Sequence, residues 1–235
     1  MTSSPLLFRY SNDQVAASDE AKAFSWEAPV PVNAFWDSFK HFAARSFPDN
    51  FSDPERNQLP INPNSADDQE TKLRPLLQLL QAKLAQEEAA TSPPQLLHEL
   101  DYKRWYGLWQ GIYVVQNELD LPEAEKTVRM LVDKRLDKTN DIVPPHMLSD
   151  HLVKIGKHKE AEETARLVCA WMDAHPRLGR DSPQAIRLRG IIARAVWLQG
   201  ASRRVEAEAL VGEIRGVVEG MGEGRFAVYQ GRRGG

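Results

Sequence analysis

The chain has 235 residues, of which 42% are hydrophobic and 27% charged, and its formal net charge at pH 7 is −3. This length and apolar content suffice for one sizeable domain. The slightly acidic balance argues against nucleic acid as a general partner, because phosphate binding needs a basic face. Cys169 is the only cysteine, which excludes an intramolecular disulfide and a cysteine-based zinc site and fits a reducing compartment.

No apolar run approaches the roughly 18 residues that a membrane-spanning helix needs. The N-terminal residues also lack the pattern of a secretory or transit leader. We therefore expect a cytoplasmic protein, or one in another reducing intracellular compartment, without a membrane span.

Residues 1–66 are predicted to form an extended segment that contains one helix. Residues 1–32 and 48–66 are rich in Ser, Asp, Asn and Pro, which is typical of loops. Between them, residues 33–47 carry phenylalanines at positions 35, 39 and 42, on one face of a helix. We expect this helix to cap the hydrophobic end of a helical stack; a helix at a membrane surface is the alternative.

Two further helices are predicted to form a hairpin. Leucines at positions 73, 76, 77, 80 and 84 indicate a helix over residues 71–88, with Pro75 in its first turn. Ser92-Pro93-Pro94-Gln95 matches a capping box with proline in the first turn. It predicts a second helix over residues 95–117.

A Glu-Ala-Glu tripeptide recurs at residues 123–125, 160–162 and 206–208, with spacings of 37 and 46 residues. Such spacings are typical of helical-hairpin repeats. Around the middle copy, one amphipathic helix is expected to end at Gly156, and the next to run to about Ala174 with the small residue Ala161 at the helix contact.

The segment Ile155–Glu162 is similar to the turn of tetratricopeptide repeats. Leu178–Pro183, followed by a helix that Asp181 or Ser182 would cap, resembles the linker of kinesin-light-chain-type repeats. The resemblance covers about residues 105–220. It implies an all-α fold, an α-α superhelix of helical hairpins over residues 67–220, with the N-terminal segment as a cap and residues 221–235 as a tail rich in Gly and Arg.

The resemblance also implies a binding groove, because the first helix of each tetratricopeptide hairpin lines the concave face. Aromatic and Arg side chains dominate binding hot spots, although tryptophans and tyrosines often pack between helices and arginines are often simply solvated. The positions that project into the groove are Tyr106, Trp109, Tyr113, Gln116 and Asn117 in the first repeat, His146, Asp150 and Lys154 in the second, and Arg187, Arg194 and Trp197 in the third.

Chaperone-binding members of the family hold a peptide carboxylate with a clamp of Lys, Asn and Arg. Asn117, Lys154 and Arg187 could supply parts of such a clamp, but Trp109 and Tyr113 do not fit it. A mixed apolar and acidic peptide is therefore favoured over an acidic C-terminal tail.

The sequence contains no recognisable nucleotide, hydrolase or metal motif, so we expect neither cofactor nor metal. His146 and Asp150, one helical turn apart, could form a general base, although such surface pairs usually have no catalytic role. We predict an adaptor or scaffold that binds a partner protein or peptide. The alternative is a small-molecule-binding protein, or an enzyme of the isomerase or cyclase type without a recognisable motif, that uses an aromatic-lined pocket.

The C-terminal residues 221–235 allow two interpretations. Five glycines and three arginines indicate a flexible tail, but Phe226–Tyr229 could dock as a short extended motif on this protein or on a partner. Neither the identity of the partner nor the oligomeric state follows from the sequence.

Overall fold

The computed structural model describes residues 8–9, 30–31, 50–52, 54–55, 68–91, 96–176 and 178–220. The chain divides into two compact units, residues 1–127 and 128–235, and the boundary falls within helix α9 (Glu123–Asp133). Each unit is described by itself. The predicted helix over residues 33–47 and the predicted tail over residues 221–235 lie outside the described residues.

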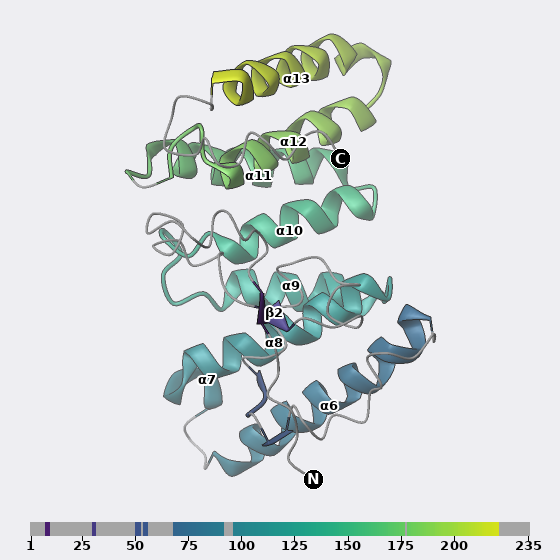
Figure 1. Ribbon diagram of the computed structural model, residues 1–235, viewed down its shortest axis with the longest axis vertical. Coiled ribbons are helices and arrows are strands. Elements are labelled where there is room, and N and C mark those ends of the chain that lie inside the picture. Colours follow the sequence, from purple (N-terminus) through teal and green to yellow (C-terminus); the bar gives the residue numbers. More distant parts are fainter. Residues whose placement is uncertain are drawn as a thin grey trace. The chain divides into compact units, whose positions relative to one another are not determined.

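Unit 1 is built mainly from a long pair of helices. Two short strands, β1 (Phe8–Arg9) and β2 (Val30–Pro31), pair antiparallel. They are followed by α6 (Gln69–Ala90), the short α7 (Leu97–Leu100) and α8 (Tyr102–Glu118), and α8 contacts both α6 and α7 (Figure 1). The core of this pair consists of Leu73, Leu76 and Leu80 from α6 and Leu108 and Ile112 from α8.

The helix boundaries in unit 1 differ from the sequence prediction at two places. Helix α6 begins at Gln69, because the Asp68 side chain accepts a hydrogen bond from the Thr71 amide, so Pro75 lies in the second turn and not in the first. The single helix predicted over residues 95–117 is also wrong. Asp101 interrupts it with a non-helical backbone and caps α8.

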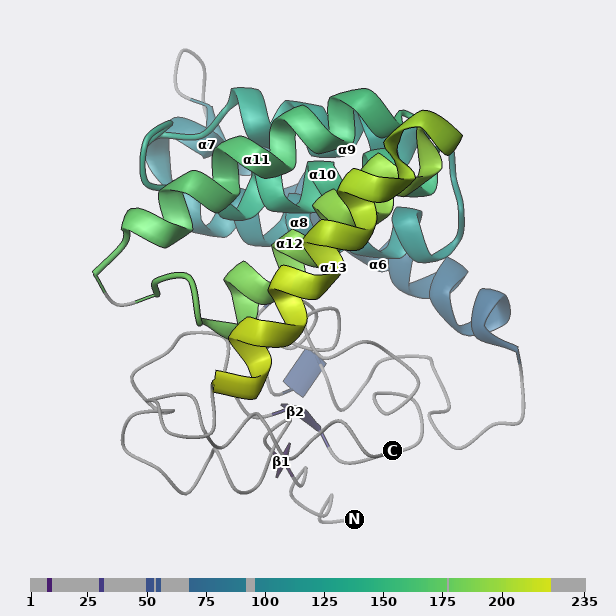
Figure 2. The ribbon, with the colours of Figure 1, turned by 90° about the horizontal axis from the view of Figure 1, so that it is seen from above.

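Unit 2 is a series of helices in which each contacts the next. These are α10 (Val143–Lys154), α11 (His158–Ala174), α12 (Pro183–Leu198), the 3-10 turn η2 (Ala201–Arg203) and α13 (Arg204–Glu219). Helix α10 contacts α11, α11 contacts α12, and α12 contacts α13. Helix α10 also contacts α12, so two helices that are not consecutive lie side by side. Figure 2 views this unit from the side of α13, with α12 beneath it.

The helix end at Gly156 and the helix start near Ser182 lie where the sequence predicted them, and a further turn follows α12. Gly156 adopts a positive φ of 82° directly after α10, and Gly200 adopts 119° after α12. Most side chains disfavour this backbone region, which explains glycine at both positions. Ser182 is the residue that caps α12, because its hydroxyl accepts a hydrogen bond of 3.2 Å from the Ala185 amide.

The Glu-Ala-Glu tripeptides begin or lie near the beginning of α9, α11 and α13. The central residues Ala124, Ala161 and Ala207 are all buried, as expected for small residues where helices approach closely. Apart from the β1–β2 pair, the regular structure of the described residues is helical, which confirms the all-α prediction at that level. None of the described helices is both long and apolar enough to cross a membrane.

Candidate functional site

The contact between α10 and α12 brings three of the predicted groove residues together. Arg187 on α12 reaches Asp150 on α10, with its Nη2 atom 3.3 Å from Oδ2, and both side chains are well exposed at 49% and 39%. His146 lies one turn before Asp150 on α10 and is half-buried. We call the surface that carries His146, Asp150, Lys154, Arg187, Arg194 and Trp197 the α10–α12 surface.

The imidazole of His146 has an unusual protonation equilibrium. Burial, together with the positive charge of Arg187, lowers its pKa from 6.5 to about 4, although the carboxylate of Asp150 acts in the opposite direction. His146 is therefore neutral at pH 7. It contributes a polar but uncharged group beside the exposed pair of Asp150 and Arg187.

The far end of α12 presents an exposed aromatic ring beside a cation. Trp197 is 43% exposed, and the guanidinium carbon of Arg204 lies 4.9 Å from the centroid of its ring. Arg194, one turn before Trp197, is exposed and makes no ion pair with the described residues. The sequence prediction included Arg194 and Trp197 but missed Arg204, which lies beyond the Gly200 turn and carries no motif that marks it.

The five groove residues predicted in the first repeat all belong to α8 in unit 1. Tyr113 and Gln116 are buried, at 3% and 5% exposed, and Gln116 accepts a hydrogen bond of 2.7 Å from the hydroxyl of Thr127. Tyr106, Trp109 and Asn117 are half-buried. A role of these residues in binding stays a prediction, as does a groove that continues across both units.

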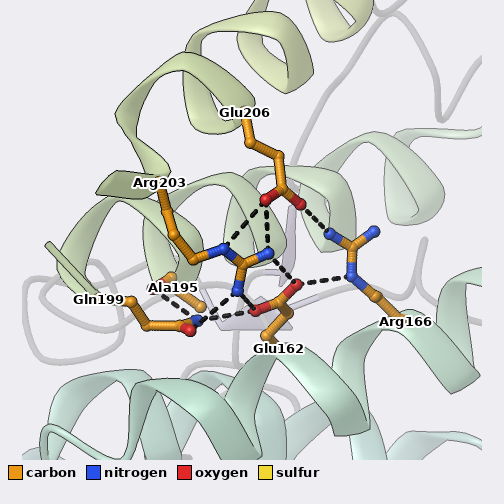
Figure 3. Close-up of polar contacts among 6 residues, drawn as sticks. All are labelled: Glu162, Arg166, Ala195, Gln199, Arg203 and Glu206. Atoms are coloured by element: carbon orange, nitrogen blue, oxygen red, sulfur yellow. Dashed lines mark hydrogen bonds and ion pairs between the residues drawn. The ribbon is translucent and has the colours of Figure 1, made fainter. Parts of the chain in front are cut away.

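A network of charged and amide side chains joins α11 and α13 with Gln199, the residue after α12, and Arg203 of η2 (Figure 3). The carboxylate of Glu162 accepts hydrogen bonds from Arg166 at 2.8 Å, from Gln199 at 2.7 Å and from Arg203 at 2.5 and 3.1 Å. Glu206 in turn accepts hydrogen bonds from Arg166 and Arg203. We call these five residues the Glu162 network.

Charge pairing in the Glu162 network keeps its central carboxylate ionised. Burial alone raises the pKa of Glu162, but the hydrogen bonds from Arg203, Gln199 and Arg166 outweigh burial and lower the pKa to about 2. Glu162 and Glu206 both come from the Glu-Ala-Glu repeats. A third repeat glutamate, Glu160, pairs with Arg129 through two hydrogen bonds of 2.7 and 2.9 Å. The repeated tripeptide therefore supplies contacts between helices.

A buried cation links α11, α12 and α13 at another place. Arg189 on α12 is buried and donates hydrogen bonds of 2.8 and 2.6 Å to the carboxylate of Asp173 on α11. It also approaches Glu213 on α13 at 3.4 Å. Like the Glu162 network, this arrangement satisfies its charges internally and is typical of a structural contact.

The described residues contain no group of three or more His, Cys, Asp or Glu side chains that could hold a metal ion. Comparisons of the chain with protein-family models, with curated proteins and with solved structures found no match. The tetratricopeptide resemblance therefore stays a prediction, and the case for a function depends on the geometry of the site.

Proposed function

We propose that this protein is an adaptor that binds a partner protein or peptide through the α10–α12 surface, on a superhelix of the tetratricopeptide type. The observation that supports this proposal most strongly is the exposed group of Arg194, Trp197 and Arg204. Trp and Arg are the side chains most often found at the energetic centre of an interface. Most other described arginines of unit 2, including Arg189 and Arg203, have their charges matched by carboxylates.

The chemistry of this surface favours a partner segment that combines acidic and apolar residues. Arg194 and the neighbouring Arg204 of α13 offer positive charge that no carboxylate of the described residues neutralises. The part of the Trp197 ring that Arg204 leaves exposed offers apolar area. A carboxylate would pair with these guanidinium groups, while an apolar side chain would cover the indole. The surface belongs to a protein that is acidic overall, so its basic character is local.

His146, at the other end of the α10–α12 surface, favours the adaptor over the small-molecule enzyme. A general base works best when its pKa lies near the pH of the reaction, whereas the pKa of His146 is lowered to about 4. A neutral imidazole of this kind is a weak base. We therefore place the small-molecule enzyme second to the adaptor.

The location that we infer is the cytoplasm or another reducing compartment. Cys169 is buried, and burial raises the pKa of its thiol, so the thiol is protonated and poorly reactive at pH 7. A single unpaired thiol is the form of cysteine that a reducing compartment preserves.

The proposal can be tested with a photo-crosslinking residue on α12. Gly190 lies one turn from both Arg187 and Arg194, is exposed, and has open space where a side chain would project. We expect a benzoylphenylalanine at position 190 to crosslink a specific protein in extracts of the native source, identified by mass spectrometry. The matched control is the same residue at Gly216 on α13, which also has open space around it.

An adduct at position 190 that is absent at position 216, and that disappears when Arg194 and Trp197 are both replaced by Ala, would support the adaptor function. Equal adducts at both positions, or an adduct at position 190 that survives the double substitution, would contradict it.

A further inference from the structure

Unit 1 binds a short piece of its own chain on the surface of α6 and α8. The described residues of this piece are Asn50, Phe51, Ser52, Pro54 and Glu55, which we call the docking segment. Asn50 is 2% exposed and Phe51 is 8% exposed, whereas the other three are exposed. An Asn-Phe pair is thus held in the interior by helices that lie more than 15 residues further along the chain.

Helix α8 has glycines where the Asn50 side chain lies. The Asn50 Nδ2 atom donates a hydrogen bond of 3.0 Å to the carbonyl of Gly107. A Cβ atom on Gly107 would lie 3.3 Å from Asn50 Oδ1, and one on Gly111 would lie 3.1 Å from Asn50 Nδ2. A glycine inside a helix costs about 1 kcal/mol relative to alanine, so two glycines one turn apart make room for this amide at the expense of helix stability.

Charged residues of α6 and α8 fix the two ends of the docking segment. Arg104 donates a hydrogen bond of 3.2 Å to the backbone carbonyl of Asn50, and it is held in place by Glu87 through hydrogen bonds of 3.0 and 2.8 Å. Lys83 lies 5.4 Å from the centroid of the Phe51 ring and forms an ion pair of 2.5 Å with Glu55.

Glu55 is also fixed within the docking segment. The Ser52 amide and hydroxyl donate to its carboxylate at 2.7 and 2.8 Å. The hydrogen bond from Lys83, followed by those from Ser52, lowers the pKa of Glu55 to about 2. The carboxylate is therefore charged at any physiological pH and faces a matching cation on α6.

From this arrangement we infer that the α6–α8 surface is a peptide-binding site, filled here by the chain's own segment, which also accepts a partner segment of the form Asn-Phe-Ser-x-x-Glu. Each side chain of that pattern has its own place: the amide against Gly107 and Gly111, the ring beneath Lys83, and the Ser-Glu pair closed on the Lys83 ammonium. Backbone recognition by Arg104 adds no demand on sequence.

Competition between the two segments determines how the site behaves. A segment joined to its own site acts at an effective concentration on the order of 1 mM. If the pattern binds in trans with a dissociation constant on the order of 10 μM, the internal segment reduces the apparent affinity for a partner about 100-fold. The site therefore opens to a partner when the internal segment is weakened or when the partner is locally concentrated.

The test uses a labelled synthetic peptide with the sequence of residues 47–57 and the full chain, with binding followed by fluorescence anisotropy. Replacing Asn50 and Phe51 by Ala in the chain empties the site, and circular dichroism checks that this open variant is folded. We expect the peptide to bind the open variant at least tenfold more tightly than wild type. Adding Gly107→Ala and Gly111→Ala should weaken binding at least tenfold, while adding Gly190→Ala, which has open space, should not.

A folded open variant that does not bind the peptide, or that binds it equally well with Ala at positions 107 and 111, would overturn the inference. Equal binding to wild type and to the open variant would overturn it too, because the internal segment would then not occupy the site. Sedimentation gives a further outcome. If wild type forms a dimer and the open variant does not, the site binds a second copy of this chain, and the inference that it accepts a different partner is overturned.

A second arm does not depend on the stability of the open variant. Lys83→Glu removes the ion pair with Glu55 at the partly exposed edge of the site. In this variant we expect the peptide with Glu55→Lys to bind at least fivefold more tightly than the peptide with Glu55. No difference between the two peptides would mean that Lys83 does not read this position, which would overturn the proposed recognition.

Discussion

The Glu162 network and the Asp150–Arg187 pair, both in unit 2, use the same kinds of side chain for different ends. Glu162 has a side chain that is 9% exposed and accepts four hydrogen bonds from three residues. Asp150 and Arg187 meet through one long contact of 3.3 Å, and both are well exposed. Burial and the number of hydrogen bonds separate the two cases.

This difference indicates which charges hold the helices together and which are available to a partner. An exposed ion pair contributes about 0–1 kcal/mol, because water competes for both ions. Removing one member of a buried pair is far more destabilising, because the remaining charge loses its partner. The sequence does not distinguish charged residues that hold helices together from those available to a partner. Only the packing of the folded chain separates them.

The largest effect that we predict is at Glu162. Glu162→Gln leaves the donors of Arg166, Gln199 and Arg203 facing an amide that carries no charge. We expect the free energy of unfolding to fall by about 3 kcal/mol, at the low end for a broken buried pair because the arginines are partly exposed. Chemical denaturation at pH 7 measures this, and a loss below about 1 kcal/mol would show that the network is not structurally important.

The next effect concerns His146, which borders the exposed pair. Its pKa is lowered in the folded state to about 4 from 6.5, so the unfolded chain binds the proton more readily. The resulting stability is present above pH 6.5 and is lost as the pH falls toward 4. Between pH 7 and pH 5 we expect a loss of about 2 kcal/mol from this group.

The pH prediction is checked by denaturation of wild type and His146→Gln at the two pH values. Glu162 does not interfere, because its stabilising effect is lost only as the pH falls from about 4.5 to about 2. An equal pH dependence in the two proteins would place the responsible group elsewhere.

A smaller effect on stability is expected at two helix glycines, one packed against another side chain and one facing open space. Gly111→Ala places a Cβ atom 3.1 Å from Asn50, whereas Gly190→Ala meets open space. We expect the first to destabilise the protein by about 1 kcal/mol, since displacement of Asn50 outweighs the gain in helix propensity, and the second to stabilise it by about 0.5–1 kcal/mol. Two thermal melts decide this, and a stabilising Gly111→Ala would show that Asn50 is not held tightly.

The smallest effect on stability is expected at the exposed pair itself. Asp150→Asn should change the free energy of unfolding by less than about 0.5 kcal/mol, because Arg187 remains solvated. A loss as large as that of Glu162→Gln, measured under the same conditions, would remove the distinction between the two regions.

The local structure of unit 2 could be predicted from the sequence because short-range chemistry determines it. Gly156 must adopt a positive φ, and a Ser-Pro pair before an apolar helix is a strong start signal at Ser182. The errors in unit 1 have a similarly local cause. Asp68 and Asp101 are caps that outweigh the apolar periodicity, and they move one helix start and break another helix.

The candidate sites were only partly predictable, because they depend on contacts between distant residues. Projection onto a repeat motif found His146, Asp150 and Arg187, which the structure places together, but it included Tyr113 and Gln116, which are buried. It also missed the docking segment. Asn50 looks like a loop residue, and Gly107 and Gly111 look like weak points in a helix until their contact is known.

The most direct test of the division between structural and binding charges uses the variant with Arg194→Ala and Trp197→Ala. Its free energy of unfolding is measured by chemical denaturation, and its retention of the partner protein is measured by affinity purification. Leu167→Ala with Arg215→Ala is the matched control, since both residues are exposed on other helices of unit 2. We predict that the variant with Arg194→Ala and Trp197→Ala keeps its free energy of unfolding to within about 0.5 kcal/mol but loses at least 90% of the partner that wild type retains. The control variant should keep both its stability and the partner. Full retention of the partner by the folded variant with Arg194→Ala and Trp197→Ala would contradict the account.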